Sequence, residues 1–119
     1  MKGGKMPRPL AYVTAAWSTY DPVTMMVQAN SYCRRIYEAG YNPICPLMMH
    51  KGFIHEDDVQ EKGDAVSMAS DILRRCRILV VCGEVRDKQV QDDMALASRL
   101  NIVSSTLDGI EQAAGTSAK

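Results

Sequence analysis

The sequence has only four cysteines, one tryptophan and one phenylalanine, and it carries no excess charge of either sign. Fourteen basic residues balance fourteen acidic ones, which argues against a protein that binds nucleic acid through bulk charge. No apolar run approaches the roughly 20 residues of a membrane-spanning helix. The beginning, MKGGKMPRP, has no apolar signal core behind its lysines. We therefore expect a cytoplasmic protein with neither nucleic acid nor membrane as partner.

The cysteines are Cys33, Cys45, Cys76 and Cys82. They form no CxxC pair and match no zinc-ligand spacing. Cys45, Cys76 and Cys82 lie within or beside apolar runs, where a free cysteine usually acts as a small core residue. Of these, Cys82 also ends a strand at one of the expected loops. Only His50 and His55 add further soft ligands, so we expect no metal site and no cofactor.

Short apolar segments alternate with amphipathic ones along the chain. Apolar and β-branched runs predict strands over residues 10–17, 41–46, 78–81 and 101–105. Apolar positions three and four apart predict helices over residues 24–37, 65–76 and 90–100, with a last helix in residues 107–114. Thr24 and Asp108 are the expected N-caps of the first and last helices. Residues 48–64 read as an irregular loop.

This β-α-β-α-β-α-β order predicts a single-domain, Rossmann-like α/β three-layer sandwich with a mainly parallel sheet of four to five strands. The domain is expected over residues 10–113, between a flexible leader (1–9) and a tail (114–119). Right-handed crossovers bring the C-terminal ends of the strands to one edge, where such sheets bind ligands. The loops expected at that edge are residues 14–21, 46–55 and 82–93.

Four stretches carry a resemblance to a known family: AYVTAAWS, YCRRIYEAGYNPICPLMM, LRRCRILVVCGE and DMALASRLNI. In this order and spacing they resemble the nucleoside 2-deoxyribosyltransferase-like superfamily, and most closely its small DUF4406-type proteins. In enzymes of that superfamily, a glutamate near the start of the last helix attacks the anomeric carbon of a nucleoside. The spacing to Ala97, Leu100 and Ile102 places Asp93 at the matching position.

The sequence departs from the family's pattern where the chemistry is done. Asp93 is one methylene shorter than glutamate, and DKQVQD lacks the small-residue turn that precedes the helix in relatives. The family's helper acid falls near Ala69, two residues from Asp71, and Arg77 stands where relatives commonly carry an aspartate. The resemblance implies a nucleoside or nucleotide ligand and, because relatives share sites between subunits, a homodimer or larger assembly.

Three functions stay open at this stage. The first is an enzyme that cleaves or transfers at an N-glycosidic bond, an N-glycosidase or deoxyribosyltransferase with Asp93 as nucleophile. The second is a non-catalytic binder of a nucleotide or an ADP-ribose-like signalling molecule. The third is an accessory interaction protein with a vestigial cleft.

Asp92 and Asp93 stand at the expected start of the helix over residues 90–100. If Asp93 faces the ligand edge, it is the candidate catalytic residue. Acids in a first helical turn also stabilise the helix dipole by about 0.3–1 kcal/mol, so a purely structural role is the alternative. Because neighbouring helix positions face different ways, at most one of the pair points inward.

The candidate ligand-binding residues come from the three loops. Trp17 is placed either to stack on a nucleobase or to fill the edge of the core. His50 and His55 suit protonation of a leaving base or phosphate binding, although an exposed loop histidine is the commoner case. The set comprises Thr14, Ala15, Ala16, Trp17, Tyr20, Pro46, Met48, His50, Cys82, Gly83, Glu84 and Lys88.

Two sets of basic residues bear on the site and on the first helix. Lys51, Arg86 and Lys88 lie in the expected loops and are either phosphate ligands or ordinary surface charge. Arg34 and Arg35 follow the amphipathic stripe of the first helix, and we expect both to face solvent.

Overall fold

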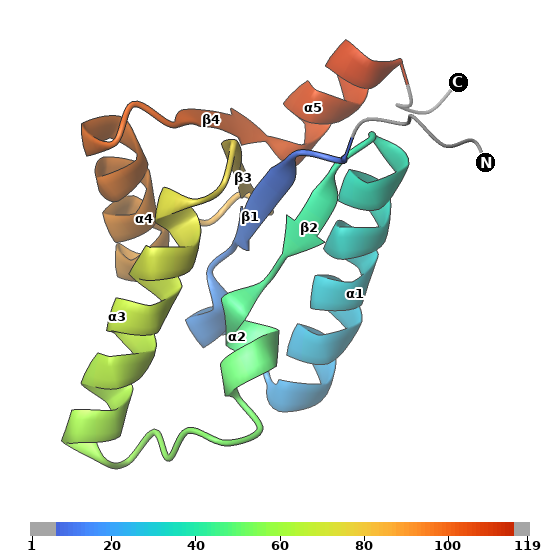
Figure 1. The fold of residues 1–119 in the computed structure, drawn as a ribbon. Helices are drawn as coiled ribbons and strands as arrows, with labels where there is room; N and C mark the ends of the chain where they lie inside the picture. Colours follow the sequence, from blue (N-terminus) through green and yellow to red (C-terminus); the bar gives the residue numbers. More distant parts are fainter. Residues whose placement is uncertain (1–6, 116–119) are drawn as a thin grey trace.

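Four short segments form one parallel sheet at the centre of this computed structural model, which describes residues 7–115 (Figure 1). They are β1 (Leu10–Thr14), β2 (Asn42–Ile44), β3 (Ile78–Val81) and β4 (Val103–Thr106). Their order in the sheet is β2-β1-β3-β4, and every neighbouring pair is parallel. The predicted α/β class and parallel sheet are confirmed.

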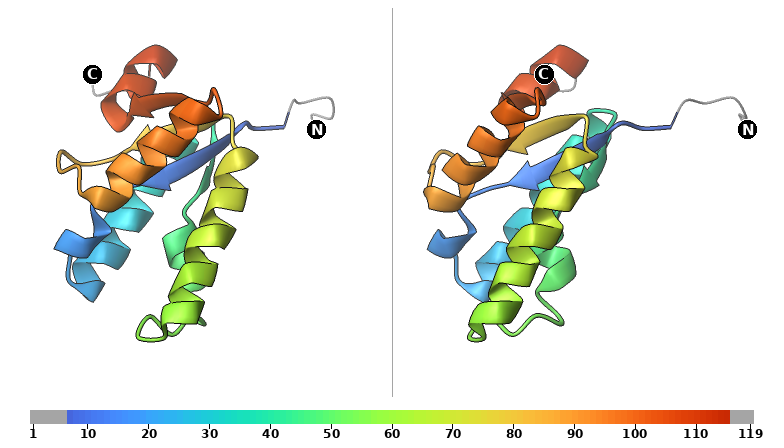
Figure 2. Two further views of the ribbon diagram at one scale, coloured as in Figure 1. Left: turned by 90° about the vertical axis from the view of Figure 1, so that its left-hand side faces the viewer. Right: turned by 60° about the vertical axis from the view of Figure 1, so that its left-hand side comes forward.

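Helices cover both faces of the sheet, as the two views of Figure 2 show. On one face lie α1 (Pro22–Glu38) and α5 (Leu107–Ala114), which contact each other. On the other face lie α3 (Val59–Arg74) and α4 (Lys88–Arg99), which form a second pair. The short α2 (Pro46–His50) follows β2, and a single 3-10 turn, η1 (Trp17–Thr19), follows β1. The result is the expected three-layer sandwich.

Side chains of the central strands alternate between the two helical layers. Ala11 and Val13 of β1 pack into the cluster beneath α1 and α5, whereas Tyr12 packs into the cluster beneath α3 and α4. Ile36 of α1 and Leu73 of α3 are fully buried in these two clusters. All four residues of β3 are buried, as expected for an apolar strand covered on both faces.

The N-caps differ from those expected. Asp21 caps α1, because its carboxylate accepts the backbone N–H of Thr24 at 2.7 Å and Pro22 occupies the first helical position. Thr24, the expected cap, therefore lies inside the helix. Thr106 caps α5 by accepting the N–H of Gly109 at 2.9 Å, so Asp108 lies in the first turn. In both helices the capping side chain stands three residues before the N–H that it satisfies.

Several strand and loop boundaries were also wrong. The first strand ends at Thr14, because η1 follows it, and the second ends at Ile44, because Pro46 starts α2. β4 begins at Val103 because Asn101 has a φ of 59° and closes the end of α4. The expected loop over residues 48–64 shrinks to residues 51–58, since α2 and α3 occupy the rest.

Arg35 faces solvent only in part, because its side chain is 40% exposed and also bridges two helices. Its guanidinium donates to both carboxylate oxygens of Glu111, at 2.7 Å and 2.6 Å, and to Asp108 at 3.3 Å. This arginine lowers the pKa of the Glu111 carboxyl and joins α1 to α5. Arg34 behaves as expected, because it is exposed, pairs with Glu38 one turn along α1 and lies over the Tyr37 ring.

The described residues begin inside the expected leader. Residues 1–6 of that leader and 116–119 of the expected tail lie outside the described part of the chain. Arg8 donates to the backbone carbonyls of Tyr37 and Tyr41, at 2.7 Å and 2.8 Å. Ala114 ends α5, and Gly115 caps it with a φ of 73°. No helix within residues 7–115 is long and apolar enough to cross a membrane.

Candidate functional site

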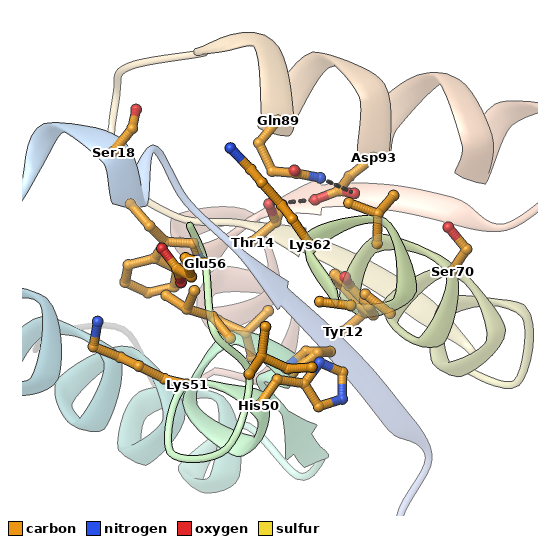
Figure 3. Close-up of a pocket in the computed structure, with 18 of the residues that line it drawn as sticks. Tyr12, Thr14, Ser18, His50, Lys51, Glu56, Lys62, Ser70, Gln89 and Asp93 are labelled. Atoms are coloured by element: carbon orange, nitrogen blue, oxygen red, sulfur yellow. Dashed lines mark hydrogen bonds between the residues drawn. The ribbon is translucent and has the colours of Figure 1, made fainter. Parts of the chain in front are cut away.

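A cavity of about 320 Å³ opens at the C-terminal end of β1, between α2, α3 and α4 (Figure 3). The chain passes from β1 to β2 on one side, and β3 then pairs with the other side of β1. The strand order therefore reverses beside this strand end. That is the position at which open parallel sheets bind their ligands.

Asp93 of α4 forms the polar end of the cavity. Its side chain is turned inward, and the residue is only 8% exposed (Figure 3). The Thr14 hydroxyl donates to Oδ2 of Asp93 at 2.7 Å, and Nε2 of Gln89 donates to Oδ1 at 3.0 Å. These two bonds fix the carboxylate between the end of β1 and the first turn of α4.

The alternative that Asp92 and Asp93 serve only to start a helix is wrong. α4 begins at Lys88, and Asp87 caps it by accepting the N–H of Val90 at 3.0 Å. Both acids therefore lie beyond the first turn, where the helix dipole has little effect. Asp92 is exposed and accepts from Lys88 at 2.9 Å, so only Asp93 points inward.

Burial raises the pKa of the Asp93 carboxyl. The hydrogen bonds from Thr14 and Gln89 favour the charged form and act against this shift, but burial outweighs them. The charges of Asp92 and Asp87 raise the pKa a little further. Asp93 therefore holds its proton to a higher pH than an ordinary aspartate, as a group engaged in acid–base or nucleophilic chemistry often does.

Tyr12 lies beside this carboxyl and was not among the residues expected in the site. It is 5% exposed, and its ring packs under α3 and α4 while also lining the cavity. Burial and the charge of Asp93 raise the pKa of the Tyr12 phenol, so the hydroxyl stays protonated. Within residues 7–115 this hydroxyl has no hydrogen-bond partner and is not sealed from solvent, so it is free to contact a bound molecule.

The wall opposite α4 is largely apolar. It includes Trp17, Pro46 and Leu47, together with Ile54 beyond α2. Trp17 is 8% exposed and packs edge-on against Tyr20, with ring centroids 5.9 Å apart. It belongs to the core cluster beneath α1 and also lines the cavity, so one ring serves both of the roles considered for it.

α3 supplies a further wall that the sequence analysis missed. Residues at helical spacing along one side of this helix line the cavity: Lys62, Ala65, Val66, Ala69 and Ser70. Their spacing is the one that also marks a core stripe, so the pattern alone could not separate the two. None of these five residues carries a carboxylate.

One comparison with known proteins decides the family. The family described as Domain of unknown function (DUF7768) matches residues 9–106, which run from β1 through β4 and include the whole cavity. The chain belongs to the DUF7768 family. No curated protein matches the chain. The resemblance to deoxyribosyltransferases therefore stays a prediction beside this DUF7768 assignment.

Five of the residues expected in the site line the cavity of this DUF7768 member: Thr14, Trp17, Pro46, His50 and Asp93. They come from β1, η1, α2 and α4, and the fold brings them together from four parts of the chain (Figure 3). Lys51 also lines the cavity, as expected for a loop residue at this edge. Lys62 of α3 is a second lysine that lines the cavity.

The other expected residues lie elsewhere: Ala15, Ala16, Tyr20, Met48, Cys82, Gly83, Glu84 and Lys88. Cys82 is fully buried in the core, and Met48 packs against the same cluster from α2 instead of lying in a loop. Gly83 has a φ of 75°, and a Cβ there would lie 3.4 Å from the Tyr32 hydroxyl and 3.6 Å from the Tyr20 hydroxyl.

The remaining loop residues have partners of their own. His55 pairs with Glu61 at 3.3 Å, and Arg86 donates to the carbonyl of Gly83 at 2.8 Å. Ser18 donates to Asp87 at 2.8 Å and ties the loop after β1 to the start of α4. Within the described part of the chain, no group of three or more histidine, cysteine or acidic side chains is placed to hold a metal ion.

The raised pKa of Asp93 predicts a pH-dependent effect of Asp93→Asn on stability. An unfolded chain loses the Asp93 proton near pH 4, whereas the folded chain keeps it to higher pH. Between the two pKa values the unfolded state binds fewer protons, so this residue makes the wild type less stable as pH rises. We expect the free energy of unfolding of Asp93→Asn, relative to wild type, to increase from about pH 4 upward. Urea denaturation across this range measures it, and a pH-independent difference would contradict it.

Proposed function

We propose that the cavity binds a nucleoside or nucleoside monophosphate and that Asp93 contacts its sugar. The observation that carries this proposal is a buried carboxylate, held by Thr14 and Gln89, that faces a cavity at the ligand edge of the sheet. The resemblance to deoxyribosyltransferases supports the same ligand class. The volume, about 320 Å³, lies at the small end of the range for ligand pockets and favours a mononucleotide over a dinucleotide.

The cavity offers each part of such a ligand a suitable contact. Trp17, Pro46 and Leu47 present apolar surface to a base, and base–aromatic stacking contributes about 1–3 kcal/mol. Asp93 and the Tyr12 hydroxyl present polar groups to the sugar. Lys51 and Lys62 supply positive charge at the opening, where a 5′-phosphate would lie.

We further propose that this site acts on the N-glycosidic bond. A carboxylate oxygen of Asp93 attacks the anomeric carbon, and the bond to the base breaks with its electron pair going to the base. The departing base takes a proton from His50, which lines the cavity on α2, or from water. Water or a second base then displaces Asp93 from the sugar and gives hydrolysis or transfer.

A second function, binding without turnover, is favoured by a specific feature of Asp93. Both of its oxygens already accept hydrogen bonds, and its raised pKa reduces the charged fraction that attacks. α3 presents Ala69 where related enzymes carry an acid. A nucleotide or ADP-ribose-like signalling molecule held without reaction needs only shape, stacking and a few hydrogen bonds.

The deciding experiment is a thermal-shift screen with chromatography of every hit. The ligands are nucleosides, nucleoside monophosphates, NAD and ADP-ribose. A ligand at 100 times its dissociation constant adds about 2.7 kcal/mol to the stability of the folded state. A shift with released base supports glycosidic chemistry, and a shift with intact ligand supports the binding function. No shift with any of them contradicts the nucleotide site and leaves an accessory interaction protein.

The assembly and location of the protein are part of this proposal. Relatives in the resembled superfamily complete their sites between subunits, and on that ground we propose a homodimer or larger homo-oligomer. We also propose that the protein is cytoplasmic. Light scattering after size-exclusion chromatography measures the assembly directly. A monomer at micromolar concentration would contradict it without affecting the cavity.

A further inference from the structure

A second cavity lies at the opposite edge of the sheet from the candidate ligand site. It has a volume of about 360 Å³ and opens where β1, β3 and β4 begin. Leu10 starts β1, Arg77 directly precedes β3, and Val103 starts β4, and all three line this cavity. Thr14, at the other end of β1, lines the first cavity. The two cavities are therefore separate and lie at opposite ends of one strand.

The two cavities differ in the charge on their walls. The first carries both signs, from Lys51, Lys62, Glu56, Asp87 and Asp93. Within the described part of the chain, the charged residues that line the second are Arg75 and Arg77, with no acidic side chain among them. A wall with two guanidinium groups and no carboxylate favours an anionic ligand.

Both arginines have N–H groups available for a ligand. Within residues 7–115, the Arg77 side chain has no hydrogen-bond or ion-pair partner. The Arg75 guanidinium donates from Nη1 to the backbone carbonyl of Asp71 at 2.8 Å, and its other N–H groups have no partner in this part of the chain. Each guanidinium carries five N–H donors in a planar fork that matches a carboxylate or a phosphate. Together the two side chains can hold one anionic group.

The ends of the neighbouring helices do not account for this pair of arginines. Arg74 in the last turn of α3 and Arg99 in the last turn of α4 suit the negative ends of those helices, and neither lines the cavity. Arg77 lies two residues beyond Arg75, the C-cap of α3, and so outside the turn on which the dipole acts most. Its place on the cavity wall is therefore independent of the helix end.

The rest of the wall suits an organic molecule better than a bare ion. Leu10, Ile102 and Val103 present apolar surface, and Val103 is 64% exposed at the edge of the sheet. Asn101 adds a side-chain amide, which can donate to an anionic oxygen. The volume falls within the range of small-molecule pockets, which is about 300–1,000 Å³.

We propose that the second cavity binds a small organic anion. Arg75 and Arg77 hold its phosphate or carboxylate group, and its apolar part packs against Leu10 and Val103. This site is distinct from the proposed nucleoside site, and the proposal does not depend on what the first cavity binds.

The test is a titration of the folded protein followed by proton–nitrogen correlation NMR, which shows which backbone amides sense the ligand. The probes are n-butyl phosphate, butyrate and n-butanol, which share one alkyl chain and differ in the anionic group. Ionic strength and pH are held constant, in a buffer without other phosphate or carboxylate. We expect saturable shifts at Leu10, Arg77 and Val103 with at least one anion. Its dissociation constant should be at least about tenfold below that of n-butanol. The tighter anion identifies the group that the site prefers.

Two variants separate a specific contact from general attraction of charge. Arg77→Gln removes one guanidinium from the wall and should weaken binding of the preferred anion about tenfold. Arg99→Gln is the matched control, because it removes the same charge two residues before Asn101 but from outside the cavity. It should change the dissociation constant by no more than about twofold, since solvent and salt screen such a charge. Equal losses in both variants would overturn the proposal.

Three results with the wild type would also overturn it. They are no saturable shift with either anion, shifts confined to Thr14 and Asp93 in the first cavity, and binding of n-butanol as tight as that of both anions. These outcomes need no variant, so the test stands even where a variant folds poorly. A negative nucleoside screen leaves this site unaffected, because each cavity has its own set of reporting amides.

Discussion

Asp93→Asn should lower base release from any nucleoside that the protein cleaves by about 1,000-fold or more, because it removes the only buried carboxylate of the cavity described here. The substitution keeps the size and shape of the side chain. Gln89 can still donate to the remaining oxygen, and the Thr14 hydroxyl can rotate to accept from the new amide. The loss should therefore appear in turnover, with the fold and the cavity preserved.

Asp92→Asn is the matched control for this experiment. It makes the same chemical change one residue earlier on the same helix, but Asp92 is exposed and pairs only with Lys88. Its effect on turnover should stay within about twofold, as expected for a surface ion pair. Steady-state rates and ligand-induced thermal shifts are measured for both variants. Equal turnover by Asp93→Asn and wild type would place the nucleophile elsewhere, and loss of binding alone would make Asp93 a ligand contact.

The fold was predictable because its signals are local and repeated. ILVV and LAYVT are short, apolar and β-branched, and such segments between amphipathic ones form parallel strands in α/β proteins. The helix ends were harder. Asp21 and Asp87 cap α1 and α4 from positions that read equally well as turn residues, and Asp92 and Asp93 read equally well as a helix start. Only the backbone geometry decides which aspartate accepts the N–H groups.

The site was predictable only in part. The end of a strand in the sequence shows which loops lie at the ligand edge of the sheet, but it does not show which of their side chains face the cavity. The end of β1 and the turn after it bring Thr14 and Trp17 to the cavity, but the residues directly after β3 do not line it. The wall from α3 comes from a helix whose apolar spacing gives no sign that one end of its stripe is left uncovered. Tyr12 was missed for a similar reason, since a tyrosine inside an apolar strand reads as core until its hydroxyl is placed.

Trp17 shows how far core and site share the same side chains. Its ring packs against Tyr20 and Tyr32, with centroids 5.9 Å and 6.2 Å away, and the same ring lines the cavity. A substitution at such a residue changes both the stability of the fold and the wall of the cavity. Its contribution to stability must therefore be measured before any effect on ligand binding is interpreted.

Trp17→Ala should lower the free energy of unfolding by about 3–5 kcal/mol, the usual cost of truncating a buried large aromatic residue to alanine. Trp17→Phe keeps an aromatic ring against Tyr20 and should lose less, so it serves as the variant that still folds if the alanine variant does not. Urea denaturation monitored by circular dichroism gives both values. Tryptophan fluorescence cannot be used, because both variants lack the sole tryptophan of the sequence. A loss below about 1 kcal/mol for Trp17→Ala would mean that Trp17 is no core residue. Normal stability in Trp17→Phe with weakened nucleoside binding would instead assign the ring to base stacking, where the larger indole contributes more.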